Sequence, residues 1–526
     1  MGATYGYRRS AWSFLLLVLL GLTAAFPWFE ATRNANEIPR LMQARALVED
    51  GTFTLSTPAA RGVDLGPDLA RNGEGLVYPN KPPGTTLVLA PAYLAAKSTD
   101  ALLERPLTLR DYGWWARLFA GVLPTLLVCF IAIRRWHEDQ GVEGVCMGLW
   151  LWVFATPAFS YAHLAYGHQL AAALLFWGIT RLTDGRNLHN YNDAFVGGML
   201  AGAAVAVDYF AVFAALPIGL AYLAVLRQSD SGLITFVSAL AGALVPIAAL
   251  AYYHDAAFGS WMETGYHHAS TAAFADKHDQ GLLGMVTPSW ERLHTDWTDH
   301  ETGLLWWSPI ILPGLFGLAQ LAFKDGPRRL ESRLYLGVIL VSAFVGACLN
   351  FEGGWRVGPR YLVLALPGLA LGWSHFSNQL RVNDIAIGVF SYVAVYSALV
   401  NLLSGNLWPH IDVTNLNSPV GELLLPLFKG GFHPYGPLDL LGMGWGQVLS
   451  FGIPLAGLFL VLKYSTEFSI VTAWVTVLAV VMAGMSVWAV PKYFEPHPKG
   501  ERNLEYVKSV YEPSKGKREP GNSERL

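Results

Sequence analysis

Three short polar segments of this 526-residue chain hold side chains that could move a proton or bind an anion. The first contains Glu37 and Arg40, and the second presents Lys81 immediately before two prolines. The third contains Arg356 and Arg360 among glycines and prolines. The carboxylate could accept a proton, and the four cations could hold a phosphate group.

The basic residues suit a phosphate for different reasons. Proline restricts the backbone after Lys81, so its ammonium is presented from a stiff loop. Glycines near Arg356 and Arg360 allow close backbone approach, and arginine can contact a phosphate through two parallel hydrogen bonds. Two alternatives stay open. Lys81 could reach lipid headgroups along its aliphatic stem, and the two arginines could bind ordinary lipid phosphates.

Glu37 follows the first long apolar stretch, at a position where a carboxyl group is expected to be partly desolvated. Desolvation raises the pKa of a carboxyl group and suits it to proton abstraction near neutral pH. The alternative is a structural charge at the N-terminus of a helix over residues 41–49, favoured by the helix dipole. Arg40 either belongs to the same site or simply pairs with Glu37.

Further polar residues lie near the expected outer ends of apolar stretches. His168 and Asp208 could line the same cavity, or each could be a hydrogen-bonded residue at the membrane boundary. The segment 254–302 is rich in histidine and acidic residues, which are zinc ligands, but it lacks a compact motif such as HExxH. We therefore expect a solvated loop that faces an acceptor, and no metal site.

The composition indicates that membrane helices must position these residues. Hydrophobic residues make up 53% of the chain and charged residues only 14%, against about 25% in soluble domains. The net charge of −3 gives no sign of a nucleic-acid partner. A helix needs roughly 20 apolar residues to cross a bilayer. The sequence predicts an all-α membrane protein with about thirteen spans: 11–29, 112–133, 143–161, 164–181, 193–208, 210–226, 232–253, 303–323, 333–350, 360–377, 384–403, 443–462 and 468–490.

The orientation follows from short basic turns, which stay on the cytoplasmic side. Arginines in such turns, including Arg135, Arg181 and Arg328, all fall on one side of the predicted topology. The long loops then lie outside: 30–111, 254–302, 351–359 and 404–442. We expect a helix at the membrane surface over 41–49 and an interfacial or re-entrant helix over 85–96. Residues 1–490 would form one membrane domain.

The C-terminal segment, residues 491–526, is polar and rich in lysine, glutamate and proline. Its composition predicts disorder. The number of spans puts this tail on the outer side, whereas its positive charge favours the cytoplasmic side.

Four motifs in this order resemble the GT-C superfamily of membrane glycosyltransferases, over the chain to about residue 490. They are Glu37, Lys81-Pro82-Pro83, the segment 303–309 (GLLWWSP) and the segment 353–361 (GGWRVGPRY). The likeness is to the protein O-mannosyltransferase and lipid A aminoarabinose transferase group. Members often have two adjacent acids where this chain has Asn36-Glu37, and an acid where it has Asn80. These departures weaken the transfer of any metal ligand.

The resemblance implies a reaction and a location. A sugar would pass from a polyprenyl-phosphate carrier to a glycan, lipid or protein acceptor, at the outer face of the inner (plasma) membrane. Glu37 would act as general base on the acceptor hydroxyl or would position it, and lysine and arginine residues such as Lys81 and Arg360 would hold the carrier phosphate. Arg40, Arg356, His168 and Asp208 are further candidates for substrate binding because of their positions in the chain. No cofactor is expected beyond the lipid-linked donor itself.

Two other functions remain as alternatives. A transporter or flippase of lipid-linked sugars would need a polar path through the middle of the membrane, and the predicted spans are nearly free of charge in their interiors. A non-catalytic scaffold for envelope polysaccharide synthesis would not need Glu37, Lys81 and Arg360 to converge. Convergence of these three side chains within the span of a sugar phosphate would therefore distinguish a glycosyltransferase from a scaffold.

Overall fold

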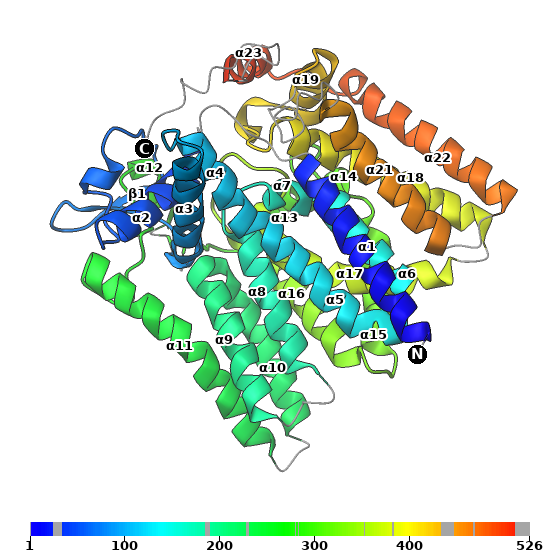
Figure 1. Cartoon of the computed structure of the whole chain (residues 1–526), viewed down its shortest axis with the longest axis horizontal. Helices are drawn as coiled ribbons and strands as arrows, with labels where there is room; N and C mark the ends of the chain where they lie inside the picture. The colour runs from blue at the N-terminus through cyan, green and yellow to red at the C-terminus, as the bar shows by residue number, and fades with distance from the viewer. Residues whose placement is uncertain are drawn as a thin grey trace.

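The computed structural model describes residues 2–24, 34–184, 190–227, 231–278, 280–281, 283–351, 353–380, 383–432, 446–465, 469–510 and 526. Within them, helices dominate, and the strands are β1 (Leu69–Arg71) and β2 (Val77–Pro79), an antiparallel pair. Figure 1 shows long helices crossing the molecule, with β1 and several shorter helices gathered at one side. The prediction of an all-α membrane protein is confirmed.

Among the described residues, five helical stretches are long and apolar enough to cross a membrane. They are Leu109–Gln140, which joins α4 (Leu109–Arg117) to α5 (Leu123–Gln140), α11 (Gly232–Phe258), α16 (Arg329–Cys348), α18 (Asp384–Leu407), and Ile470–Lys492, which contains α22 (Ile470–Ala489). Shorter apolar helices are α1 (Gly2–Ala24), α6 (Val142–Phe154), α9 (Tyr191–Val207), α10 (Ala215–Leu226), α15 (Ile311–Phe323) and α21 (Gly446–Ser465). The number of thirteen spans stays a prediction.

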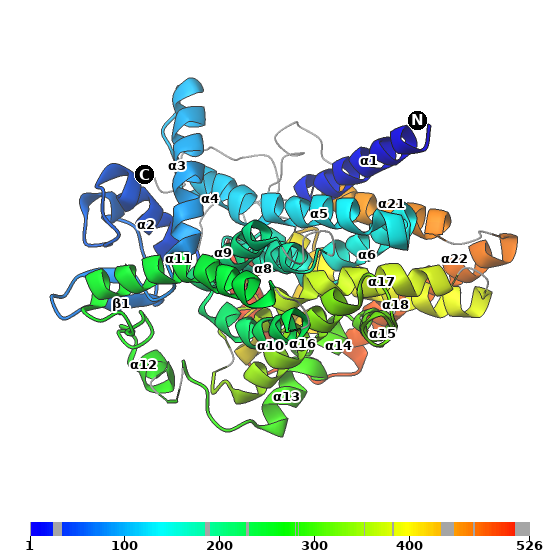
Figure 2. The same ribbon diagram turned by 90° about the horizontal axis from the view of Figure 1, so that it is seen from below.

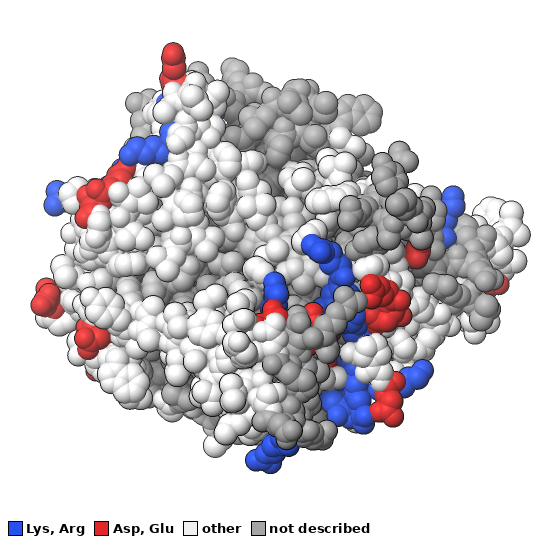
Figure 3. Space-filling model, turned by 60° about the horizontal axis from the view of Figure 1, so that its bottom comes forward, with Lys and Arg blue, Asp and Glu red and all other residues white. Residues whose placement is uncertain are grey.

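Large apolar side chains on the outermost helices point away from the protein. In α11 these include Leu233, Ile234 and Tyr252, and in α22 they include Ile470 and Trp474. Exposed apolar surface of this extent is expected where a helix faces lipid. Figure 3 shows a broad uncharged surface, with basic and acidic side chains concentrated in one part of the view.

The basic turns of the predicted cytoplasmic side meet in the structure. Arg135 at the end of α5 pairs with Glu331 of α16 at 3.0 Å. Arg328 bridges Asp139 at 2.6 Å and Glu331 at 3.2 Å. The ends of helices from different parts of the chain therefore share one ion-pair network, and the side of the membrane on which it lies stays a prediction.

The first outer loop is built on two helices that cross each other, α2 (Ile38–Glu49) and α3 (Gly84–Leu102) (Figures 1 and 2). We expected α2 to lie flat on the membrane surface, but most of its side chains are buried, and Gln43 is fully enclosed. Gln43 accepts a hydrogen bond from Thr86 at 2.7 Å and donates one to the Phe53 carbonyl at 2.8 Å. The prediction of a surface helix is therefore wrong for α2, because polar contacts tie it into the fold.

The C-terminal tail is also more ordered than its composition predicts. Helix α23 (Gly500–Val510) buries Val507, and its Tyr506 ring lies 6.2 Å from that of Trp355 in the outer loop 351–359. The prediction of disorder is wrong for this helix, since an amphipathic face packs onto the fold. The contact places α23 on the predicted outer side, and residues 511–525 lie outside the described part.

Helices α9 and α11 pack closely through small residues. A Cβ atom on Gly198 would lie 1.8 Å from the Ala239 carbonyl oxygen, and one on Gly202 would lie 2.3 Å from that of Ala243. The four-residue spacing of the two glycines puts both on one face of α9, the arrangement that lets membrane helices approach.

We predict that Gly198→Leu forces α9 and α11 apart and lowers the free energy of unfolding by at least about 1–3 kcal/mol. The control is Gly219→Leu in α10, where an added Cβ meets no atom within 4 Å. Thermal unfolding of the purified protein in detergent measures both. Equal stability of the two variants would contradict the close packing.

Candidate functional site

Three buried cations converge where the first outer loop meets the helix bundle. Arg40 comes from α2, Lys81 from the turn after β2, and Arg360 from the first residue of η4 (Arg360–Gly368); they are 3%, 9% and 7% exposed. The charges of Arg40, Arg360, Asp68 and Asp208 all act on Lys81. The structure therefore brings together Lys81, Arg360, Arg40 and Asp208, four of the residues chosen from sequence.

Burial gives Lys81 an unusual acidity. Desolvation is the largest effect and, with repulsion from Arg360 and Arg40, lowers the pKa of Lys81 to about 8 against the opposing attraction of Asp68 and Asp208. A bound anion would favour the charged form and raise this pKa again. The site is therefore built for a ligand that brings negative charge.

The second outer loop covers Lys81 from the other side. The Lys81 ammonium lies 4.6 Å from the centre of the Tyr266 ring. A Cβ atom on Gly265 would lie 2.8 Å from the Asn80 Cα atom, so only glycine allows this approach of the two backbones. The aromatic ring thus holds the cation in place without neutralising it.

Each of the two arginines keeps a donor that is not used within the described structure. Arg360 donates to the Tyr361 hydroxyl at 2.8 Å, and Arg40 donates to the Asn36 carbonyl at 3.1 Å and to its side chain. The Nε groups of both arginines are buried with no hydrogen-bond partner among the described residues. Buried donors of charged groups are costly to leave unpaired, so this geometry favours a bound anion.

Glu37 has a different environment from the one expected. Arg117 of α4 donates to its two oxygens at 2.9 and 2.8 Å, and the Ala165 backbone N–H donates at 2.8 Å. Burial raises the pKa of Glu37, but attraction to Arg117 and these hydrogen bonds outweigh it, and the net shift is downward. The prediction of a raised pKa is therefore wrong, and so is pairing with Arg40, which bonds to Asn36 instead.

The structure brings His168 and Asp208 into direct contact. The His168 Nδ1 atom lies 2.5 Å from an Asp208 carboxylate oxygen, and the other oxygen accepts the Phe210 N–H at 3.1 Å. His168 begins α8 (His168–Leu182) directly after Gly167, whose φ of +89° favours glycine. The His168 ring centre lies 6.1 Å from that of Tyr361, beside Arg360.

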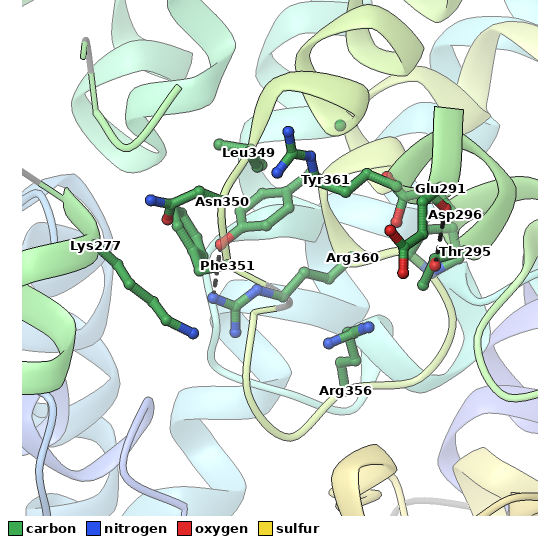
Figure 4. Close-up of a pocket in the computed structure, with 13 residues that line it drawn as sticks. Lys277, Glu291, Thr295, Asp296, Leu349, Asn350, Phe351, Arg356, Arg360 and Tyr361 are labelled. Atoms are coloured by element: carbon green, nitrogen blue, oxygen red, sulfur yellow. Dashed lines mark hydrogen bonds between the residues drawn. The ribbon is translucent and has the colours of Figure 1, made fainter. Parts of the chain in front are cut away.

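A cavity of about 270 Å³ opens on the other side of Arg360 (Figure 4). Arg356, Arg360 and Tyr361 line one side, and Asp296 of α13 (Trp290–Trp297) lines another. Arg356 thus belongs to the cavity, and burial raises the pKa of Asp296 to about 6 against the opposing charge of Arg356. The loop 254–302 therefore contributes side chains to the lining of this cavity.

Sequence reasoning did not single out four residues that shape this region. Two of them could have been found from the sequence. Tyr361 follows Arg360 in the segment 353–361, and Arg117 is a charged residue in an apolar stretch. Asp68 and Asp296 lie in long polar loops with no local pattern to distinguish them. Among the described residues, no three histidine, cysteine or acidic side chains gather in a way that could hold a metal ion.

We predict that Glu37→Ala lowers the free energy of unfolding by about 3–5 kcal/mol, because it leaves the Arg117 charge buried and unpaired. Replacing both residues, Glu37→Leu with Arg117→Met, should recover most of that loss. Arg181→Ala, which breaks the exposed pair with Asp193, is the control and should cost less than about 1 kcal/mol. Thermal unfolding measures all three; a double variant no more stable than Glu37→Ala would contradict the ion-pair role.

Comparisons with known proteins find similar structures but no similar sequence. No family model matches the chain, and no curated protein matches it by sequence. The crystal structure of ArnT from Cupriavidus metallidurans in the apo state has 13% identity over 91% of this chain and 78% of that chain, with a TM-score of 0.48. The same protein bound to undecaprenyl phosphate has 13% identity, coverages of 94% and 87%, and a TM-score of 0.46. Arabinosyltransferase EmbB from Mycobacterium smegmatis has 11% identity over 95% of this chain and 42% of that chain, with a TM-score of 0.44.

Proposed function

We propose that this protein is a glycosyltransferase that moves a sugar from a polyprenyl-phosphate-linked donor to an acceptor at the outer face of the inner membrane. The observation that carries the proposal is the convergence of Arg40, Lys81 and Arg360 in a buried site. Among the largest electrostatic effects on Lys81, the attraction comes from Asp68 and Asp208 and the repulsion from Arg360 and Arg40. A site of this charge suits a phosphate group better than a neutral ligand.

The cations have a direct use in the reaction. An acceptor oxygen attacks the anomeric carbon, the bond from that carbon to the phosphate oxygen breaks, and the lipid phosphate leaves with the electron pair. Negative charge then develops on the leaving phosphate. Fixed positive groups around it stabilise the transition state more than the ground state, which accelerates the step.

The position of the site separates this function from transport. Arg40 and Lys81 lie in the first outer loop, and Arg360 directly follows the outer loop 351–359. A transporter is expected to bind its substrate on interrupted helices near the middle of the membrane. A site formed mainly by outer loops suits a donor whose lipid tail stays in the bilayer while its phosphate and sugar reach the loops.

The cavity beside Arg360 is the proposed place of the acceptor. Its volume of about 270 Å³ is near the lower end of small-molecule sites. Asp296 and Glu291 contribute hydrogen-bond acceptors to it, and Arg356 contributes donors. Arg360 acts on Lys81 and Arg40 and also lines the cavity, so a phosphate bound by Arg360 would sit within reach of an acceptor hydroxyl in the cavity.

We predict that the purified protein binds undecaprenyl phosphate, and that the affinity falls above pH 8. The free Lys81 has a pKa of about 8, so binding a phosphate above this pH requires uptake of a proton. The affinity should fall by up to about tenfold per pH unit until the raised pKa of the complex is passed. Binding titrations in lipid nanodiscs from pH 7 to 10 measure this.

Lys81→Arg is the matched control, because arginine stays charged over this range. Its affinity should be nearly independent of pH, whereas Lys81→Ala should bind weakly at every pH. Undecaprenol, which lacks the phosphate, is the control ligand. If it bound the wild-type protein as tightly as undecaprenyl phosphate does, the phosphate site would be misassigned.

The function itself is tested by mass spectrometry of envelope glycans and lipids from a deletion strain. We expect one sugar substituent to disappear and a lipid-linked sugar to accumulate. Wild-type protein and Arg329→Ala should restore the substituent, because Arg329 forms an exposed pair with Asp325 in a turn on the predicted cytoplasmic side. Arg360→Ala should fail. An unchanged set of glycans and lipids in the deletion strain would refute the proposal.

A further inference from the structure

We propose that His168 is the catalytic base of this transferase, that it takes the proton of the acceptor hydroxyl through Nε2, and that Asp208 positions it. The inference rests on the proposed function and deepens it. It also replaces the role that the sequence motifs implied for Glu37.

The candidates for the base differ in what already occupies their acceptor atoms. Both oxygens of Glu37 receive hydrogen bonds from Arg117, and one also receives the Ala165 N–H. Both oxygens of Asp208 are engaged as well, by His168 and by the Phe210 N–H. A carboxylate whose oxygens already accept hydrogen bonds is a weak base with little room for a further proton.

The His168 ring, by contrast, has one nitrogen left over. Its Nδ1 faces Asp208, whereas its Nε2 is buried with no hydrogen-bond partner among the described residues. His168 as a whole is only 6% exposed. A buried polar atom without a partner needs an explanation, and an acceptor hydroxyl would supply the missing contact.

The carboxylate determines which nitrogen can act as the base. Because an ionised carboxylate only accepts hydrogen bonds, Asp208 selects the tautomer with the proton on Nδ1. Nε2 then carries the lone pair. The same carboxylate stabilises the imidazolium that forms when Nε2 takes a proton. The pair thus has the two features that a positioned general base needs, a fixed orientation and compensation of the new charge.

The dyad also belongs to the donor site. Arg360 and Arg40 act electrostatically on His168, and Arg40 acts on Asp208 as well. The rings of Tyr161, Tyr166 and Tyr361 surround the imidazole, with centres 5.6, 6.2 and 6.1 Å away. These rings restrict access of water to the reacting atoms. Tyr361, whose ring lies beside the imidazole, also lines the cavity together with Arg360, so this ring connects the surroundings of His168 with the proposed acceptor cavity.

The reaction step is balanced with these groups alone. The acceptor oxygen bonds to the anomeric carbon as His168 Nε2 removes its proton. The bond between the anomeric carbon and the phosphate oxygen breaks, and the phosphate leaves with the electron pair toward Arg40, Lys81 and Arg360. The imidazolium, paired with Asp208, later releases its proton to solvent.

The test uses membranes from the deletion strain, which hold the accumulated donor and the unmodified acceptor. Purified full-length protein is added, and mass spectrometry follows the initial rate at which the lipid-linked sugar is consumed. We expect His168→Gln to lower this rate at least about 100-fold, as for loss of a general base. Its affinity for undecaprenyl phosphate should stay within about twofold of wild type, because the base does not hold the phosphate.

Asp208 is tested with two variants that leave the imidazole ring in place. Asp208→Asn should lower the rate strongly without weakening undecaprenyl phosphate binding at pH 7, because it removes a negative charge from the cation cluster. Asp208→Glu, which keeps a carboxylate, should recover part of the rate. A purely structural role would not distinguish the two, and it would lower the unfolding temperature of both in detergent.

The outcomes separate the two proposals. If wild-type protein consumes the donor and His168→Gln does so at the same rate, the base is misassigned while the function stands. If His168→Gln loses undecaprenyl phosphate binding along with the rate, His168 is a binding residue and the inference fails. If wild-type protein consumes no lipid-linked sugar at all, the proposed function fails first.

Discussion

The ion pair between Glu37 and Arg117 fixes the first outer loop to the helix bundle, and the geometry of the site depends on it. Glu37 directly precedes α2, and its carboxylate is held by α4 and by the backbone before α8. Arg40 follows one turn later on the same helix. Because the start of α2 is held at these points, the direction of the Arg40 side chain is determined by contacts outside the ligand site. A residue that resembles a catalytic acid in sequence thus acts as an anchor in the fold.

The site concentrates positive charge where charge is expensive to bury. Arg40, Lys81 and Arg360 are all more than 90% buried, and the cost of removing a charge from water is met only in part by nearby carboxylates. The lowered pKa of Lys81 follows from its desolvation and from repulsion by the neighbouring arginines. Because the nearby carboxylates do not neutralise all of this positive charge, an anion bound among the three cations would be stabilised. Pre-organised charge of this kind also favours departure of a phosphate.

Much of the architecture could be predicted from the sequence, because long apolar stretches and basic turns are local signals. The candidate cations Lys81 and Arg360 could be selected for a related reason: they lie in short segments whose prolines and glycines are unusual in themselves. The role of Glu37 was not predictable, because its partner Arg117 lies in another segment and only the folded chain brings them together. The same holds for the contact between His168 and Asp208, and for Asp296, which the sequence could not distinguish from its solvated neighbours. The order of α23 depends on packing against Trp355, which no local pattern reveals.

The contact between α23 and the loop 351–359 has a consequence for the biogenesis of the protein. Tyr506 lies against Trp355, the residue beside Arg356, so a late part of the polypeptide packs on a loop that is made much earlier. During synthesis, the loop that carries Arg356 and leads to Arg360 emerges well before the helix that packs on it. The contact can therefore form only after the C-terminal helix has been delivered to the same side of the membrane as the loop. Completion of the packing around this loop is in this way coupled to completion of the chain's insertion.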